Sequence, residues 1–361
     1  MRGIYPRLDR QGYRHTACSL VLLALCLAGS LQGCGLLFDA VQWVAPAASD
    51  EVDTICRRGR VQIGMAAEPF RPFVFPAIWT DEGARITGLD VELARLIAGA
   101  LSRHCGQGPI VPTIQLVRFR DLFLVLNEGK IDLFVSAVPA NIPMPTRAGF
   151  GYSIPYFEQA GISGITARHE VVDRVHANLA AQTLHPPPDG LVANEHALEG
   201  LTIAVQDGTS AHFYALANLK QNRLWVCDSL PAAFEVIPAL GEPPIDVILG
   251  EHPILRYMVN NVRKKWIPLT HNTGRPFLLT RTHYAVVMAE ESYRLRWFTN
   301  SLLFRLEESG RLEGIRTRWV KDSYAFPRRA ATEGLPFDIE MMVQQNDQGG
   351  CRLAPPVRQF H

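Results

Sequence analysis

Short apolar runs alternate along the sequence with stretches in which apolar residues recur at helical spacing. The clearest apolar run covers residues 131–138 and lies between Gly129 and Pro139. An apolar run of this length between turn-forming residues predicts a strand buried in a parallel sheet. Residues 60–65 predict another strand, and residues 90–104 predict a helix with one apolar face. Strands that alternate with helices in this way predict an α/β fold with an open, mostly parallel sheet.

The second half of the chain repeats this alternation. Residues 201–205 predict a strand that opens into a turn and a helix, and residues 231–240 predict another helix. The strand predicted at 244–251 then repeats the Ile-Asp pair of the 131–138 run, although a single pair can match by chance. Two similar α/β halves in one chain predict two lobes with a crevice between them.

A Pro-rich loop, Arg147 and an aromatic segment at 150–157 follow the 131–138 strand. In a parallel sheet, ligands bind at the loops that leave the carboxyl ends of the strands. The guanidinium of Arg147 is a planar fork of donors that suits a carboxylate. The position therefore suggests Arg147 as a ligand-binding residue, and the alternative is an ordinary surface arginine in a loop.

Composition limits the classes of function. A chain of 361 residues is long enough for about two domains. Its 47% hydrophobic and 20% charged residues are usual for a globular protein. The formal charge of +1, without a basic run, gives no reason to expect nucleic-acid binding.

The N-terminus has the charged-then-apolar order of an export signal. Four arginines precede the apolar run 20–28, which is too short to span a bilayer comfortably. Residues 31–34, Leu-Gln-Gly-Cys, resemble the lipobox of bacterial lipoproteins, with Gln32 where a small residue is usual. The resemblance implies a signal peptide at 1–33, lipidation of Cys34 and a tether at 34–55, which would hold an exported, extracytoplasmic or periplasmic protein on a membrane. The alternative is a signal anchor or a soluble exported protein.

Four cysteines follow Cys34, namely Cys56, Cys105, Cys227 and Cys351. An even number in an oxidising compartment predicts two disulfides, for which four cysteines allow three pairings. Cys56 precedes the first strand, and Cys105 ends the helix that should return antiparallel to that strand, so topology favours a bond between them. A bond between Cys227 and Cys351 follows only by elimination. No CxxC motif occurs, which argues against a structural zinc site.

Several motifs, taken in order, resemble the bacterial extracellular solute-binding proteins of family 3, the type that binds polar amino acids. They are VQIG at 61–64, GLDVELA at 88–94, GKIDL at 129–133, SIPYF at 153–157, AVQDGT at 204–209, IDVIL at 245–249 and GRL at 310–312. The resemblance covers about residues 56–320. It implies a type II periplasmic-binding-protein fold, in which two lobes joined by two crossover hinge strands close on a small ligand.

The same resemblance divides the chain into lobes. Residues 56–167 and 281–322 should form lobe 1, and residues 168–280 should form lobe 2. The crossovers are expected near 160–166 and near 284–288.

Two segments lie outside this pattern. Residues 168–197 contain three consecutive prolines and are expected to be a polar surface insert. Residues 323–361 are expected to be an irregular C-terminal tail, which would wrap lobe 2 if Cys351 is bridged.

The resemblance also implies which residues bind the ligand. Phe70 and Phe119 match two aromatics that pack on the ligand side chain, and Arg147 matches the arginine that binds its carboxylate. Glu251 matches the acid that pairs with the ligand ammonium. The remaining matches are backbone contacts at Ser136 and Ala137, and the turn of Gly208, Thr209 and Ser210, whose amides would receive the carboxylate at a helix N-terminus.

Some positions depart from the family pattern. Pro139 and Asn141 stand where threonines are usual. Ala67 stands where many amino-acid binders have a second acid, and Glu68 is adjacent. These departures leave room for a ligand other than a plain α-amino acid.

The function that the resemblance implies is capture of a small zwitterionic ligand, an amino acid, for the permease of an ABC importer, without a cofactor or a metal. Two alternatives keep the same fold: a cyclohexadienyl-type dehydratase with Glu251 as general base, and a sensory or scaffold lipoprotein without a transporter. The metalloprotease motif HExxH is incomplete, because His169 and Glu170 are not followed by its second histidine. The chain is therefore expected not to be an enzyme.

Overall fold

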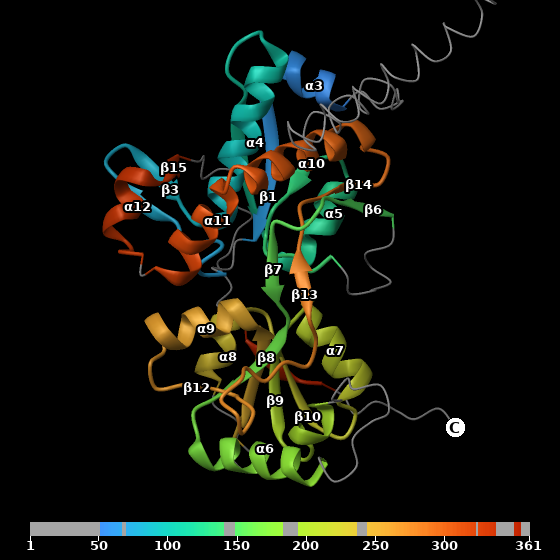
Figure 1. Cartoon of the computed structure of the whole chain (residues 1–361), viewed down its shortest axis with the longest axis vertical. Coiled ribbons are helices and arrows are strands. Elements are labelled where there is room, and N and C mark those ends of the chain that lie inside the picture. Colours follow the sequence, from blue (N-terminus) through green and yellow to red (C-terminus); the bar gives the residue numbers. More distant parts are fainter. Residues whose placement is uncertain are drawn as a thin grey trace, which may run out of the picture.

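The computed structural model describes residues 51–66, 70–140, 149–182, 194–236, 244–322, 324–336 and 350–354. Two lobes lie one above the other, and two paired strands, β7 (Phe157–Ala160) and β13 (Thr282–Tyr284), run between them (Figure 1). The predicted signal peptide and Cys34 lie outside the described residues. Within the part that is described, no helix is long and apolar enough to span a bilayer.

Lobe 1, the upper lobe in Figure 1, is built on a five-stranded sheet with the order β4-β1-β5-β14-β6. Its strands are β1 (Arg60–Ala66), β4 (Val111–Val117), β5 (Leu133–Phe134), β6 (Phe150–Tyr152) and β14 (Val287–Ala289). Strand β1 pairs parallel with β4 and β5, whereas β14 runs antiparallel to β5 and β6. Its helical elements are α3 (Glu51–Arg58), α4 (Leu89–Cys105), η1 (Phe119–Asp121), α5 (Leu122–Asn127), α10 (Tyr293–Glu308), α11 (Arg311–Arg316) and η4 (Thr317–Lys321).

The apolar run at 131–138 lies at the centre of this sheet, although less of it pairs as a strand than the pattern predicts. Only Leu133 and Phe134 pair with β1, while the buried segment continues to Val138. The helix predicted at 90–104 is α4. Gly106 ends α4 with φ 64°, a left-handed conformation that glycine adopts because it has no Cβ.

Lobe 2 is built on a six-stranded sheet with the order β12-β8-β11-β9-β10-β16. Its strands are β8 (Ile162–Thr166), β9 (Thr202–Gln206), β10 (Arg223–Cys227), β11 (Val247–Glu251), β12 (Ile267–Pro268) and β16 (Cys351–Leu353). Strand β9 pairs parallel with β10 and β11, and the other pairs are antiparallel. Its helical elements are α6 (His169–Gln182), η3 (Asn194–Leu198), α7 (Ser210–Asn218), α8 (Leu230–Glu235) and α9 (His252–Asn261).

Strand β8 belongs to the lobe 2 sheet, where Ile162 lies opposite Glu251. The boundary expected at residue 167 had placed this strand in lobe 1, so the first crossover comes earlier than expected, at β7. Gly161 separates β7 from β8, and a Cβ there would lie 2.1 Å from the carbonyl oxygen of Thr280. Only glycine fits this close approach between the crossing chains. The other predicted domain boundaries stay predictions.

The segment 168–197, expected to be a polar surface insert, begins with a helix that packs into the lobe 2 core. Val171, Val175 and Leu179 are spaced by four residues along α6, and their side chains are buried in that core. The buried stripe has one residue per turn, Val172 is partly buried beside it, and charged residues such as Asp173 and Arg174 interrupt the apolar pattern. A stripe this narrow gives a weak amphipathic signal, which explains why the sequence did not reveal the helix.

The C-terminal tail is not irregular in its described parts, so that expectation is wrong for them. It contributes α12 (Arg328–Glu333) and β15 (Leu335–Pro336) to lobe 1, where β15 completes a small sheet with β3 (Gly83–Ile86) and β2 (Ile78–Thr80). Its later strand, β16, pairs with β10 of lobe 2. Each short strand completes the edge of a sheet that the rest of the chain has built. The local sequence contains no signal for such pairing.

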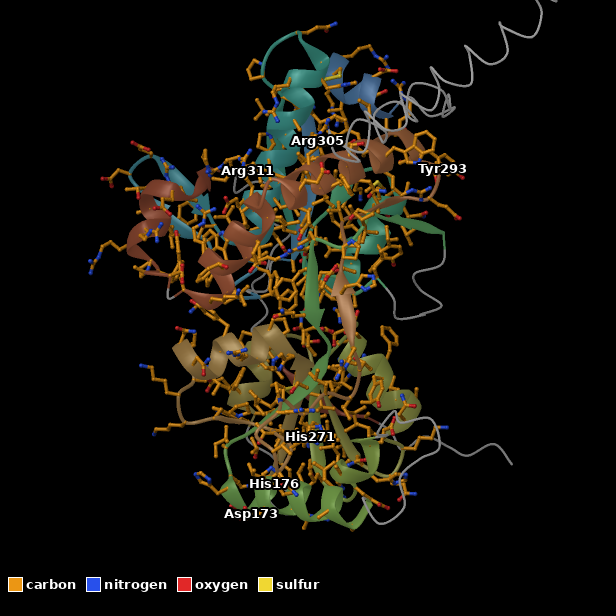
Figure 2. The ribbon with its side chains drawn as sticks, viewed as in Figure 1. Asp173, His176, His271, Tyr293, Arg305 and Arg311 are labelled. Carbon is orange, nitrogen blue, oxygen red and sulfur yellow. A yellow bond between two sulfur atoms is a disulfide. The ribbon has the colours of Figure 1, made fainter. Side chains whose placement is uncertain are left out.

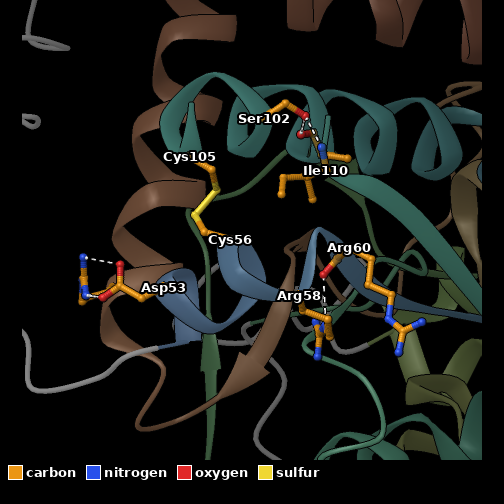
Figure 3. The surroundings of a disulfide bond; sticks show 9 residues. Asp53, Cys56, Arg58, Arg60, Ser102, Cys105 and Ile110 are labelled. Atoms are coloured by element: carbon orange, nitrogen blue, oxygen red, sulfur yellow. Dashed lines mark hydrogen bonds and ion pairs between the residues drawn. A yellow bond between two sulfur atoms is a disulfide. The ribbon is translucent and has the colours of Figure 1, made fainter. Parts of the chain in front are cut away.

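Two disulfides are present. Cys56 in α3 is bonded to Cys105 at the end of α4, with a Cα–Cα distance of 5.4 Å (Figure 3). This is the bond that topology favoured. The second bond joins Cys227 to Cys351 and so attaches β16 to β10. In the chain-entropy model, closing loops of these lengths stabilises the fold by roughly 4–5 kcal/mol per bond.

Candidate functional site

A cavity lies between the two lobes, at the carboxyl ends of the strands. Lobe 1 contributes Phe70, Phe119, Ala137 and Pro139, and lobe 2 contributes Gln206, Thr209, Ser210, Ala211, Leu230, Leu249, Gly250, Glu251 and Ile254. The cavity volume is about 30 Å³, which is room for one or two water molecules. An amino acid is several times larger, so the lobes or the lining side chains must move to admit one.

The two predicted aromatic residues form the apolar part of the lobe 1 wall. The rings of Phe70 and Phe119 meet edge to face, with centroids 5.3 Å apart and an interplanar angle of 88°. Each side chain is only 5% exposed. The structure therefore brings both residues to the cavity, and their contact with a ligand stays a prediction.

Of the two residues predicted to contact a ligand through their backbone after β5, Ser136 binds lobe 1 through its side chain and Ala137 through its N–H. The hydroxyl of the fully buried Ser136 accepts a hydrogen bond from the N–H of Ala66 at 2.9 Å. Ala137 lines the cavity, but its N–H donates to Asp90 Oδ2 at 2.9 Å and lies 3.1 Å from Tyr156 Oη. Ala137 has φ 47°, a conformation uncommon for a residue with a Cβ. The structure thus places Ala137 in the site and Ser136 behind it.

Asp90 is a fully buried acid that the sequence analysis did not single out. Burial raises its pKa to about 7, although hydrogen bonds from Tyr156 and Ala137 favour the charged form. Its Oδ1 atom is buried and, within the described chain, has no hydrogen-bond partner. Burial and the neighbouring Asp90 also raise the pKa of Tyr156. The signal available in the sequence was an acidic residue, Asp90, between the apolar residues Leu89 and Val91.

On lobe 2, the predicted turn lies at the N-terminus of α7. Thr209 is the N-cap residue, and its hydroxyl accepts a hydrogen bond from His212 N and donates one to Gln206 O. A Cβ on Gly208 would lie 2.6 Å from Cβ of Arg120, and the φ of Gly208 is 73°. Only glycine fits this position, because the two lobes touch there. Ser210 is the first residue of the helix.

Glu251 ends β11 and is 9% exposed at the cavity wall. Its Oε1 accepts a hydrogen bond from the hydroxyl of Ser210, and its Oε2 accepts one from Tyr284 Oη at 3.1 Å. Burial and the adjacent carboxylate raise the pKa of Tyr284, so this phenol stays a donor. The Glu251 side chain does not cap the following helix. Its carboxylate is instead oriented by one hydroxyl from lobe 2 and one from the hinge strand β13.

Sequence reasoning missed one polar side chain of the cavity, that of Gln206. Gln206 ends β9 and is 3% exposed. Its Oε1 accepts a hydrogen bond from Leu230 N at 3.1 Å, while its Nε2 has no partner among the described residues. Gln206 lies within the quoted AVQDGT motif, two residues before Gly208. That position was the signal available in the sequence.

Four charged side chains connect the lobes next to this turn. Arg120 of lobe 1 lies 2.9 Å from Asp207 and 3.8 Å from Asp228 of lobe 2. Arg352 of β16 lies 3.1 Å and 3.6 Å from the same two carboxylates. Burial would raise the pKa of Asp207, but hydrogen bonds from Arg352 and Arg120 outweigh burial and lower it. Asp207 is therefore charged at neutral pH and binds both arginines.

Several predicted residues cannot be placed. Arg147, Asn141, Ala67 and Glu68 lie outside the described residues, so their roles stay predictions. In the described chain, no group of three or more His, Cys, Asp or Glu side chains could hold a metal ion. Asp173, His176 and His271 lie at the lower end of lobe 2, away from the space between the lobes (Figure 2).

One comparison with known proteins shows the family of this chain. A model of the family described as bacterial extracellular solute-binding proteins, family 3, matches residues 62–322. A search of curated proteins finds no match.

Three solved structures illustrate the likeness in fold. A mutant of ArgBP from T. maritima is 24% identical with a TM-score of 0.56, covering 75% of this chain and 99% of that one. A substrate-binding protein of an amino acid ABC transporter from Streptococcus pneumoniae, bound to L-arginine, is 20% identical with a TM-score of 0.58, covering 76% and 99%. The ancestral amino acid-binding protein AncCDT-1, a precursor of cyclohexadienyl dehydratase, is 18% identical with a TM-score of 0.57, covering 75% and 99%. At these identities the likeness shows the fold alone.

Proposed function

Since the chain belongs to the bacterial extracellular solute-binding proteins of family 3, we propose that it captures a small zwitterionic ligand, an amino acid, in the cavity between its lobes. Delivery to the permease of an ABC importer follows from the same family. The ligand binds when the lobes are apart, and closure surrounds it. The amino-acid-binding proteins among the similar structures support this class of ligand.

The observation that carries the proposal is the orientation of Glu251 at the cavity wall. Ser210 and Tyr284 hold its two oxygens from two directions. Each carboxylate oxygen accepts about two hydrogen bonds, so a ligand ammonium can bind beside these hydroxyls. Charge-assisted hydrogen bonds of this kind are about twice as strong as neutral ones. The carboxylate of Glu251 would therefore bind the ammonium of the ligand.

The ligand carboxylate would bind at the N-terminus of α7 and at Arg147. In the first turn of a helix, the N–H groups point outward and the helix dipole favours an anion. Ser210 and Ala211 belong to that turn and line the cavity. Arg147 remains a predicted partner from lobe 1, since an arginine fork binds a carboxylate with two parallel hydrogen bonds.

Calorimetric titration of Glu251→Gln and Arg147→Ala tests these roles, with the ligand that a thermal-shift screen of amino acids finds for the wild type. Each variant should lose roughly 2–5 kcal/mol, or about 30- to several-thousand-fold in affinity, because a closed cavity leaves the ligand charge unpaired. Glu170→Gln on the outer helix α6 is the matched control and should bind normally. Binding of both site variants within about threefold of the wild type would refute the assignment.

A dehydratase is the second candidate, favoured by the likeness to a precursor of cyclohexadienyl dehydratase. From prephenate or arogenate an aromatic product forms when carbon dioxide and the ring hydroxyl leave together, so no carbon-bound proton has to be removed. Glu251 would then act on the departing hydroxyl, to which its protonated carboxyl would donate a proton, and not as the general base that the sequence suggested. Incubation with prephenate or arogenate tests this directly. Formation of an aromatic product that Glu251→Gln abolishes would establish the enzyme. Absence of product, together with amino-acid binding, would support the solute-binding protein.

A sensory or scaffold role is the third candidate. It predicts that no permease gene and no ATPase gene lie next to the gene of this protein.

Membrane attachment through Cys34 is a separate part of the proposal. The charged N-terminus, the short apolar run and the lipobox-like residues 31–34 support it. Cys34→Ser should release the protein from membranes or block its processing. An unchanged membrane fraction and an unchanged mature mass in this variant would contradict lipidation.

A further inference from the structure

The side chain of Gln206 has a fixed orientation. Its Oε1 accepts the N–H of Leu230 at 3.1 Å, and only the oxygen of an amide can accept that hydrogen bond. The Nε2 group must therefore point the other way. It is buried and has no partner in the described chain, although Gln206 lines the cavity.

Other buried side-chain donors of the described chain also lack a partner, such as Trp225 Nε1 and Arg263 Nε, but only the donor of Gln206 belongs to a residue that lines this cavity. A buried donor without a partner costs roughly 1–3 kcal/mol, so a native structure retains one only for a reason. The other side-chain donors on this wall are already used. The hydroxyl of Ser210 donates to Glu251, and that of Thr209 donates to Gln206 O. Of the described side chains of the cavity, Gln206 is the one that offers a donor to a ligand.

The surroundings of Gln206 limit what can bind there. Leu230, Leu249 and Ile254 line the same wall, and an apolar wall does not solvate a charge. The carboxylate of Glu251 on this wall would repel an anionic side chain. The amide Nε2 carries two donor hydrogens and accepts nothing. A matching ligand group is therefore an uncharged oxygen acceptor.

We propose that Gln206 selects an amino acid whose side chain carries a neutral oxygen acceptor, such as the carboxamide of glutamine or asparagine. The inference rests on the proposed function, in which the α-carboxylate and α-ammonium are bound elsewhere in the cavity. Arginine and lysine side chains have only donors, so they would leave the Nε2 group unpaired. The ligand class would then differ from the L-arginine bound in one of the structurally similar proteins.

Titration calorimetry of the wild type with four L-amino acids gives the first test. Glutamine should bind at least tenfold more tightly than methionine, which is similar in length but has no amide, and than arginine or lysine. Equal or tighter binding of methionine, arginine or lysine would overturn the inference and leave the proposed function intact. Binding of none of these four, and of none of the other amino acids in the thermal-shift screen, would overturn both.

Gln206→Glu gives the second test, because it changes only the donor end. A glutamate keeps an oxygen for Leu230 N and replaces the Nε2 donor with an acceptor. Glutamine should lose at least tenfold in affinity, while arginine and lysine should gain relative to it. Gln206→Met removes the donor without adding a buried charge, so it should lose the preference for glutamine over methionine. If either variant weakens all ligands equally, Gln206 contacts their common backbone atoms and the inference fails.

Discussion

The two walls of the cavity use their polar groups in opposite ways. In the described part of lobe 1, the wall is apolar, and the N–H of Ala137 is hydrogen-bonded to Asp90 behind it. In lobe 2, Gln206, Ser210 and Glu251 bring polar side chains to the cavity surface. The described lobe 1 wall therefore brings no polar side chain to the cavity, whereas the lobe 2 wall brings the carboxylate of Glu251 and the amide of Gln206 to it.

This difference suggests a division of roles between the lobes. Apolar contact is proportional to buried area and has little directional preference, so the described lobe 1 wall selects mainly for size. Hydrogen bonds depend on angle and on donor or acceptor type, so the lobe 2 wall selects for chemistry. Substitutions in the two walls should accordingly differ in their effect on ligand ranking.

The largest expected effect concerns the internal support of the lobe 1 wall. The pKa of Asp90 is raised from 3.8 to about 7 by burial, which corresponds to roughly 4 kcal/mol. The folded protein therefore binds the proton of the Asp90 carboxyl more tightly than the unfolded chain does. The resulting stability is complete below about pH 4 and is lost as the pH rises to about 7.

Asp90→Asn cannot ionise, so its stability relative to the wild type should rise by on the order of 4 kcal/mol between pH 4 and pH 8. Urea unfolding at several pH values measures this difference. Ligand affinity at one pH should change little, because Asp90 lies behind the wall. The role of Asp90 as a buried acid behind the wall would be wrong in two cases. One is a difference in unfolding free energy between Asp90→Asn and the wild type that does not change with pH, and the other is a large loss of ligand affinity in the variant.

The next effect concerns the apolar surface of the same wall. Phe119→Leu keeps an apolar side chain and removes the ring that meets Phe70 at 5.3 Å. That ring pair lies within lobe 1 and contributes to its stability. The smaller side chain also offers the ligand about 40 Å² less apolar surface, worth about 1 kcal/mol, so the affinity for the ligand should fall about fivefold. Calorimetry with ligands of different side-chain length should show the largest change for the longest. Phe119→Leu could instead change the preference between ligands whose side chains donate hydrogen bonds and ligands whose side chains accept them. In that case lobe 1 does not select mainly for size, and the proposed division of roles between the lobes is wrong.

The smallest expected effect is on the rate of ligand dissociation, and it comes from the ion pair between the two lobes. Arg120 reaches Asp207 across the lobes, and the pair is partly exposed. Partly exposed ion pairs contribute up to about 1 kcal/mol and weaken with salt. Arg120→Gln should therefore speed ligand dissociation a few-fold at low salt and hardly at all at high salt, as measured by stopped-flow fluorescence. Arg118→Gln, whose partner Asp121 lies in the same lobe, is the control. Equal effects of the two variants would exclude a role for Arg120 in holding the lobes closed.

The sequence predicted the parts of the molecule that depend on local pattern. The central apolar run, the helix α4 and the bond between Cys56 and Cys105 follow from hydrophobic spacing and chain direction. Strands β15 and β16 could not be predicted, because each completes the edge of a sheet formed by distant segments. In the site, the resemblance to the family indicated Glu251, which the structure places at the end of β11. The unpaired donor of Gln206 could not be foreseen, since it depends on where Leu230 N lies.

The cavity should bind a zwitterion through Glu251. The direct measurement is calorimetric titration of the wild type with its amino-acid ligand and with the analogue that lacks only the α-ammonium. The ammonium should contribute at least 2 kcal/mol, so the analogue should bind about 30-fold or more weakly. In Glu251→Gln the gap between the two ligands should largely disappear. Equal binding of both ligands to the wild type would contradict the account.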